Sequence, residues 1–134
     1  MLFRSPEDVN SEEARAAISA AEPEAVLICA YGALLKEPLL SEHEMLNVHP
    51  SLLPRWRGAA PIERAIEAGD EETGVSIMRP TAEFDAGPVC LQRREAIRPD
   101  DDYGSLAPRQ RGSSEGCTLN ISCSDRSGSL SSAP

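Results

Sequence analysis

The N-terminal part of the chain alternates between a helical pattern and a short apolar run. Residues 11–21 are rich in Ala and Glu, and Asn10 stands before them as an N-cap, with Glu13 in the reciprocal position. Pro23 ends this pattern. Residues 25–30 are apolar throughout, which is typical of a strand covered on both faces. We therefore predict a helix followed by a central strand of a parallel sheet.

The middle of the chain continues the same alternation. Residues 61–69 have helical spacing and begin with a proline, which suits the first turn of a helix. Residues 74–79 and 89–93 are strand-like, with weaker alternation in the second segment. A further strand runs into Asn47 and gives way to a loop between Pro50 and the helix. This order predicts an α/β fold, a partial Rossmann-like open parallel sheet.

The C-terminal part has a different character. The chain has 134 residues, which bounds it to one domain at most. Residues 107–134 are rich in Ser, Gly and Arg and have almost no apolar periodicity. We therefore expect a partial domain over residues 1–106 and a disordered tail over residues 107–134. Two explanations of the tail stay open: a lost reading frame near Arg109, or a genuine flexible extension.

An amide and an imidazole lie two residues apart at Asn47 and His49. In an extended segment residues i and i+2 share a face, so both side chains project into the same space at the end of a strand. The imidazole can exchange a proton near neutral pH, and the amide can donate to a developing oxyanion. Such a histidine is also commonly a structural residue. Asp85 lies in a turn-rich stretch and could orient the imidazole, or could simply form the turn.

These residues stand within longer recognisable segments. The stretch NVHPSLLPRWRGAAP (residues 47–61), with residues 72–78 and 85–87 downstream, resembles the folate-dependent formyltransferases. The resemblance runs from about Pro6 to Leu106. Within that family, the RWRGAAP portion is most similar to the members that formylate methionyl initiator tRNA.

The resemblance implies roles for particular positions. Asn47, His49 and Asp85 match the catalytic trio of the family. The resemblance places the folate site at Ser51, Leu52, Leu53 and Pro54, and at Tyr31 and Gly32 in the turn after the first strand. A plain packing role for Tyr31 is an equal alternative.

The resemblance also implies the reaction and the missing parts. The formyl donor would be 10-formyltetrahydrofolate, the acceptor would be the α-amine of initiator methionyl-tRNA, and no metal would be needed. A family member of full length would add βα units before this chain and a barrel-like domain after it. Two alternatives stay open: a formyltransferase acting on a small amine such as glycinamide ribonucleotide, and a truncated product without catalysis. We expect this chain by itself to be weakly active or inactive.

Charge and composition limit the partners. The formal net charge is −9, and the tail has three arginines against two acids, so the rest of the chain carries −10. An acidic body binds nucleic acid poorly, and we expect no DNA partner. Arg55 and Arg57 are local exceptions that could contact a tRNA phosphate or base, or could form a packing clamp around Trp56. No long apolar stretch or signal peptide is present, which favours a cytoplasmic protein without a membrane partner.

Overall fold

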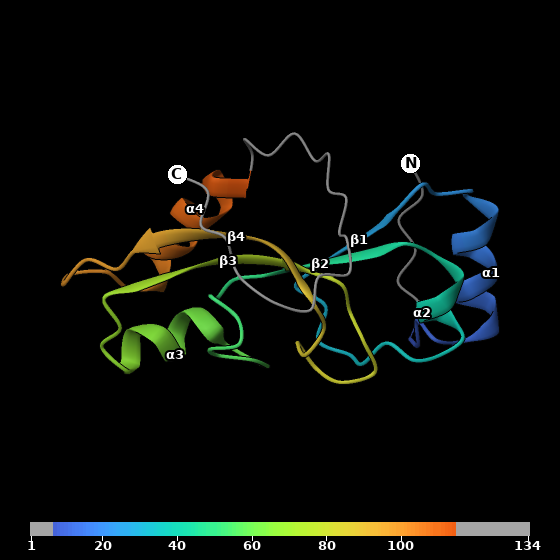
Figure 1. The fold of residues 1–134 in the computed structure, drawn as a ribbon, viewed down its shortest axis with the longest axis horizontal. Coiled ribbons are helices and arrows are strands. Elements are labelled where there is room, and N and C mark those ends of the chain that lie inside the picture. Colours follow the sequence, from blue (N-terminus) through green and yellow to red (C-terminus); the bar gives the residue numbers. More distant parts are fainter. Residues whose placement is uncertain (1–6, 115–134) are drawn as a thin grey trace.

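The computed structural model describes residues 7–114, which form one four-stranded sheet with four helices (Figure 1). The sheet has the strand order β1-β2-β3-β4. The strands are β1 (Val26–Cys29), β2 (Met45–His49), β3 (Glu72–Met78) and β4 (Val89–Ala96). The helices are α1 (Glu12–Ala20), α2 (Leu39–Glu42), α3 (Pro61–Glu67) and α4 (Tyr103–Ser114). The predicted α/β class and open sheet are confirmed.

The direction of the strands corrects one part of the prediction. β1 and β2 are parallel, but β3 is antiparallel to β2 and β4 is antiparallel to β3, so the sheet is mixed. The connection from residue 79 to residue 88 is too short to carry the crossover helix that a parallel return usually needs. The last two strands therefore form a hairpin, and only the first pair has the expected parallel arrangement.

The first strand is not central among the described residues. β1 pairs only with β2 and lies at the edge of the sheet, where 60% of Leu27 is exposed. Its side chains alternate between partly buried and exposed, so only one face is covered. The prediction of a central strand was wrong because a uniformly apolar segment indicates burial but does not show how many strands pair with it.

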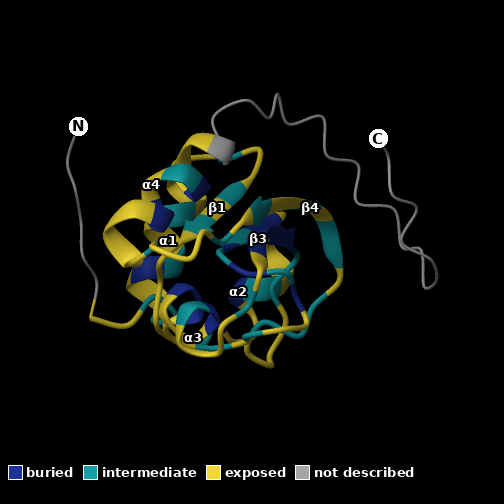
Figure 2. Ribbon diagram, turned by 90° about the vertical axis from the view of Figure 1, so that its left-hand side faces the viewer, coloured by how far each residue is buried: buried dark blue, intermediate teal, exposed yellow. Residues whose placement is uncertain are grey.

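Two apolar clusters attach the helices to the sheet. Leu35, Leu39 and Met45 form the first, with Ile28 from β1 and Ile18 from α1 packed against it. The second joins α3 to α4 and consists of Ile62, Leu106 and Ala107, with Ile66 and Ile97 against it. In Figure 2, α1, α3 and α4 all lie to one side of β3 and β4.

The cap of α1 differs by one residue from the prediction. Ser11 is the N-cap, and its hydroxyl accepts a hydrogen bond from the backbone N–H of Ala14 at 3.2 Å. Asn10 instead bridges to a later loop, where its Nδ2 donates to the carbonyl of Leu34 and its Oδ1 accepts from the N–H of Lys36. Asn10 therefore makes a tertiary contact in place of the helix cap that the local pattern predicted.

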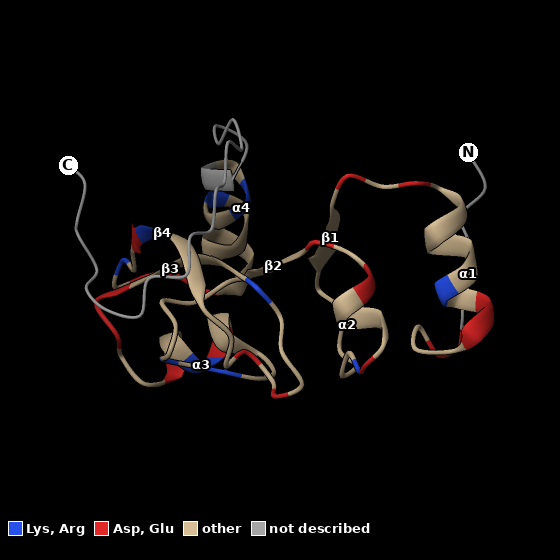
Figure 3. Ribbon diagram, turned by 45° about the vertical axis from the view of Figure 1, so that its right-hand side comes forward, with Lys and Arg blue, Asp and Glu red and all other residues tan. Residues whose placement is uncertain are grey.

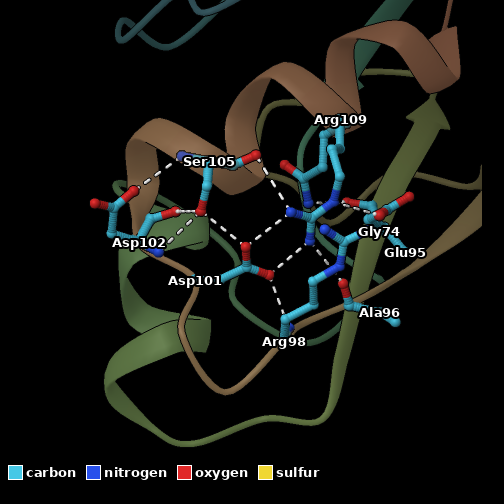
Figure 4. A network of polar contacts seen from close by, with 9 residues as sticks. Gly74, Glu95, Ala96, Arg98, Asp101, Asp102, Ser105 and Arg109 are labelled. Atoms are coloured by element: carbon cyan, nitrogen blue, oxygen red, sulfur yellow. Dashed lines mark hydrogen bonds and ion pairs between the residues drawn. The ribbon is translucent and has the colours of Figure 1, made fainter.

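Helix α4 shows that the predicted boundary at residue 107 is wrong. The helix continues to Ser114, and Leu106, Ala107 and Gln110 are buried. Arg109 fixes this part of the helix by bonding to Asp101 and Glu95 (Figure 4). Composition could not reveal these contacts, because their partners lie outside the tail. The rest of the predicted tail, residues 115–134, lies outside the described residues.

Candidate active site

Strand β2 brings Asn47 and His49 to one place. The two residues are paired with Met78 and Ser76 of β3, and Ile28 of β1 flanks Asn47 on the other side. Residues i and i+2 of a strand point to the same face, so both side chains face the same region. Pro50 follows directly, and the chain leaves the sheet there. The predicted shared face is confirmed.

Asp85 meets both of these side chains from the β3–β4 connection. Its Oδ1 lies 3.4 Å from Nδ2 of Asn47, and its Oδ2 lies 3.5 Å from Nδ1 of His49. The backbone N–H of Gly58 donates to Oδ2 at 2.8 Å. The carboxylate therefore has one short hydrogen bond, while its contacts to the amide and the imidazole are long. The structure brings together the three residues that the sequence singled out.

The second nitrogen of His49 has a defined partner. Nε2 lies 2.9 Å from the carbonyl oxygen of Trp56. A carbonyl oxygen only accepts, so Nε2 carries a hydrogen and Nδ1 is the nitrogen that faces Asp85. The side chain is 7% exposed, which leaves it reachable only from the cavity that it borders.

A cavity of about 580 Å³ opens beside these three residues. This volume lies within the roughly 300–1,000 Å³ of small-molecule sites. Its wall is mainly apolar, and Asn47, His49 and Asp85 line it together. Tyr31 and Gly32 line the cavity, as a ligand contact requires. Such a wall can accommodate a largely apolar small molecule.

The sequence did not single out several residues of the cavity wall. These are Phe84 beside Asp85, Glu63 of α3, Glu83, and Tyr103 at the start of α4. No local signal distinguishes them, because they come from three separate parts of the chain. Only the packing of α3 and α4 places them at one opening.

Unusual backbone conformations concentrate around the site. Positive φ angles occur at Ala30 (52°), Trp56 (59°), Ala60 (52°) and Asp85 (49°). Such conformations cost about 1–3 kcal/mol each for residues other than glycine and persist where the surroundings enforce them. Ala30, Ala60 and Asp85 line the cavity, and Trp56 binds His49. The strained backbone therefore lies around the cavity and its polar residues.

Gly87 shows why the Asp85 turn needs a glycine nearby. A Cβ atom built on Gly87 would lie 1.8 Å from the carbonyl oxygen of Arg79. The N–H of Arg79 also bonds to the carbonyl of Pro88, which closes this turn. The close approach fixes the loop that carries Asp85.

The predicted folate segment, Ser51 to Pro54, does not line the cavity. The Ser51 hydroxyl is fully buried and donates to the carbonyl of Arg55. Ser76 and Gln92 bond to the backbone of this segment through the carbonyls of Ser51 and Leu53. The side chains of Ser76 and Gln92 thus anchor this loop to β3 and β4. The structure does not bring the Ser51 to Pro54 segment to the opening that Tyr31 and Gly32 line.

The two loop arginines have different surroundings. Arg55 forms a bidentate pair with Asp70, at 2.8 and 2.6 Å, and stacks on Trp56. The pair lowers the pKa of Asp70, chiefly through the Arg55 hydrogen bonds. Arg57 is exposed, and within residues 7–114 no acid lies within ion-pair distance of its guanidinium. Arg55 thus forms the clamp, and Arg57 keeps a charge available to a ligand.

The described residues contain no other recognisable centre. No group of three or more His, Cys, Asp or Glu side chains within residues 7–114 could hold a metal ion. None of the helices found in that range is long and apolar enough to cross a membrane. Figure 3 shows acidic residues along α1 and α2, and basic residues near β4 and α4.

Comparison with known proteins agrees with this geometry. The family model described as formyl transferase matches residues 3–118. The chain belongs to the formyl transferase family. The match passes Leu106, so family character extends through the buried part of α4.

Among individual proteins, the chain is similar to two enzymes named methionyl-tRNA formyltransferase. The methionyl-tRNA formyltransferase of Idiomarina loihiensis is 52% identical over 103 residues, which is 75% of this chain and 33% of the relative. That of Thermotoga neapolitana is 43% identical over 106 residues, or 78% of this chain and 34% of the relative. The chain thus spans about a third of the length of these curated relatives.

A solved formyltransferase shares the fold. The phosphoribosylglycinamide formyltransferase of Bacillus halodurans matches with a TM-score of 0.70 and 30% identity, over 75% of this chain and 53% of that one. The shared architecture includes the mixed sheet described above. The similarity of this chain therefore extends to formyltransferases named for different acceptors.

Proposed function

We propose that this chain is part of an enzyme that transfers a formyl group from 10-formyltetrahydrofolate to the α-amine of initiator methionyl-tRNA in the cytoplasm. The observation that carries the proposal is the meeting of Asn47, His49 and Asp85 at one cavity. The identity of 43–52% to proteins named methionyl-tRNA formyltransferase supports this acceptor.

The cavity fits the donor in size and chemistry. Its apolar wall, with Tyr31 and Phe84, suits a planar ring, and Asn47, His49 and Asp85 supply adjacent polar groups. When bound, 10-formyltetrahydrofolate supplies the carbon that the amine attacks. The backbone turn at Tyr31 and Gly32 would hold the ring system.

Asn47, His49 and Asp85 would each have a different role in the transfer. The amide Nδ2 of Asn47 makes only a long contact, so it is free to donate to the formyl oxygen as negative charge gathers there. His49 offers Nδ1 on the same side. Asp85 keeps the imidazole oriented while one proton passes from the attacking amine to the departing folate nitrogen. The new C–N bond forms as the old one breaks, so atoms and charge balance.

Arg57 is the proposed contact for a tRNA phosphate or base. Its guanidinium is exposed beside Gly58, which lines the cavity. Arg55 is a weaker candidate because its charge is already paired with Asp70. The net charge of −9 makes this a small electrostatic contribution, so most tRNA affinity would come from elsewhere.

The test is an acceptor competition. Charged initiator tRNA and glycinamide ribonucleotide are offered together with 10-formyltetrahydrofolate to the 134-residue chain and to the longest protein encoded at its locus. We expect the longer protein to formylate the tRNA, and this chain to be weak or inactive. Preferential formylation of the ribonucleotide would favour the alternative function, formyl transfer to glycinamide ribonucleotide. If both forms bind the donor but neither transfers the formyl group, the chain is a gene product without catalysis.

A further inference from the structure

Trp56 is held by two guanidinium groups over its ring and through its indole nitrogen. The guanidinium carbon of Arg55 lies 4.4 Å from the ring centroid, and that of Arg64 lies 4.8 Å from it. Both distances are within the range of cation–π attraction. The indole Nε1 donates to Oδ2 of Asp70 at 2.7 Å. These contacts confine the side chain to one orientation.

Asp70 is itself fixed by the end of α3. Its backbone N–H donates to the carbonyl of Ala65 at 3.0 Å, and Gly69 before it has a φ of 72°. Its carboxylate receives two hydrogen bonds from Arg55 in addition to that of Trp56. Its side chain is nearly buried. Asp70 therefore ties the loop around Trp56 to a helix end.

The backbone of Trp56 links this cluster to the proposed site. Its φ of 59° is unfavourable for a bulky residue, so neighbouring contacts must maintain it. The carbonyl of this residue accepts the Nε2 hydrogen of His49 at 2.9 Å. If the Trp56 side chain were released, the backbone would relax and the carbonyl would move away from the imidazole.

We infer that Asp70 is a positioning residue for His49 and acts through Trp56. It keeps the Trp56 carbonyl in place, which holds the imidazole hydrogen on Nε2 and directs Nδ1 toward Asp85. The inference rests on the proposed function only for the consequence that a mispositioned His49 would slow formyl transfer. The alternative role of Asp70 is a plain packing clamp, which would affect stability but not the imidazole.

Long-range ¹H–¹⁵N NMR of the imidazoles separates these roles without needing donor or acceptor. In the 134-residue chain we expect His49 as one species with hydrogen on Nε2. In Asp70→Ala we expect loss of that single Nε2–H species, because Nε2 no longer has a fixed carbonyl acceptor. The sequence has only two histidines, so His43, whose ring lies 3.3 Å from Ser19, is the internal reference. The single tryptophan reports the release of Trp56 by its fluorescence.

The matched control is Glu72→Gln, which removes a carboxylate from the exposed ion pair with Arg94. It should leave both histidines unchanged. An unaltered His49 tautomer in Asp70→Ala, with Trp56 emission shifted, overturns the inference. If Asp70→Ala does not fold, Trp56→Phe decides, because it removes the indole N–H and keeps the ring in place. A single Nε2 tautomer in folded Trp56→Phe then overturns it as well. Because no formyl transfer is measured, failure here is distinct from failure of the proposed function.

Discussion

Asp85 and Asp101 are both nearly buried, with 11% and 3% of their side chains exposed, but their hydrogen bonds differ. Asp101 accepts from both Nη atoms of Arg109, from the N–H of Arg98 and from the hydroxyl of Ser105, all within 2.6–2.8 Å. Asp85 has one bond of similar length, from Gly58. The first carboxylate is saturated and stabilises α4, whereas the second keeps capacity for a ligand.

The comparison separates residues that hold the fold from residues of the proposed site. Arg109 holds α4 against β4 through its ion pairs with Glu95 and Asp101, and it lies in regular helical backbone. The Asp85 region depends on strained loops and long contacts. Substitution should therefore affect stability in one region and catalysis in the other, which the following experiments test.

The largest effects are expected at the three polar residues of the proposed site. Asn47→Ala removes the amide proposed to stabilise the formyl oxygen, and such losses typically lower the rate by about 10²–10³. His49→Ala and Asp85→Ala should each abolish transfer. The measurement is formylation of initiator tRNA by an active full-length form, with Glu72→Gln as the control. Normal turnover by any of the three variants would exclude its proposed role.

The second effect concerns the core beside α4. Leu106 is fully buried in the cluster with Ile62, and truncating such a leucine typically costs about 2–5 kcal/mol. Leu106→Ala should lower the free energy of unfolding in urea by this amount. Leu27→Ala is the control, since Leu27 is mostly exposed and should change stability little. Equal losses in both variants would show that the core is placed incorrectly.

The third experiment compares the two carboxylates directly. Asp101→Asn should lower the Tm, because the Arg109 charge then loses its bidentate partner. Asp85→Asn should leave the Tm nearly unchanged but remove transfer activity. Calorimetry on both variants checks the first part, and the formylation assay checks the second. A larger Tm loss for Asp85→Asn would reverse the interpretation of the two regions.

The smallest effect is the response to acid. Hydrogen bonds from Arg109, followed by the N–H of Arg98, lower the pKa of Asp101 below its ordinary value of 3.8. The carboxylate therefore contributes its stabilisation fully above pH 3.8, and loses it as the pH falls toward the lower folded pKa. The Tm gap between the parent chain and Asp101→Asn should be constant above that value and shrink below it. A gap that grows in acid would contradict this linkage.

Sequence reasoning was most successful where chemistry is local. The period of a strand placed Asn47 and His49 together, and the turn residues placed Asp85 in a loop. It failed where long-range contacts decide. The Trp56 carbonyl and the Gly58 N–H are backbone groups present at every residue, so sequence gives no sign of their special partners.

Two other errors have the same origin. The antiparallel direction of β3 is a property of its pairing with β2, and the helical state of residues 107–114 depends on partners such as Asp101. The exposed side of β1 likewise depends on what lies beside it. Each of these properties belongs to a pair of segments, and a single segment does not encode it.

The edge position of β1 has a practical consequence for handling the protein. Within residues 7–114 one side of this strand has no neighbouring strand, and Leu27 projects from it. An open edge with an apolar surface is a template on which another chain can add a strand. Purified material should therefore self-associate as its concentration rises. A charged residue in place of Leu27 should keep it monodisperse.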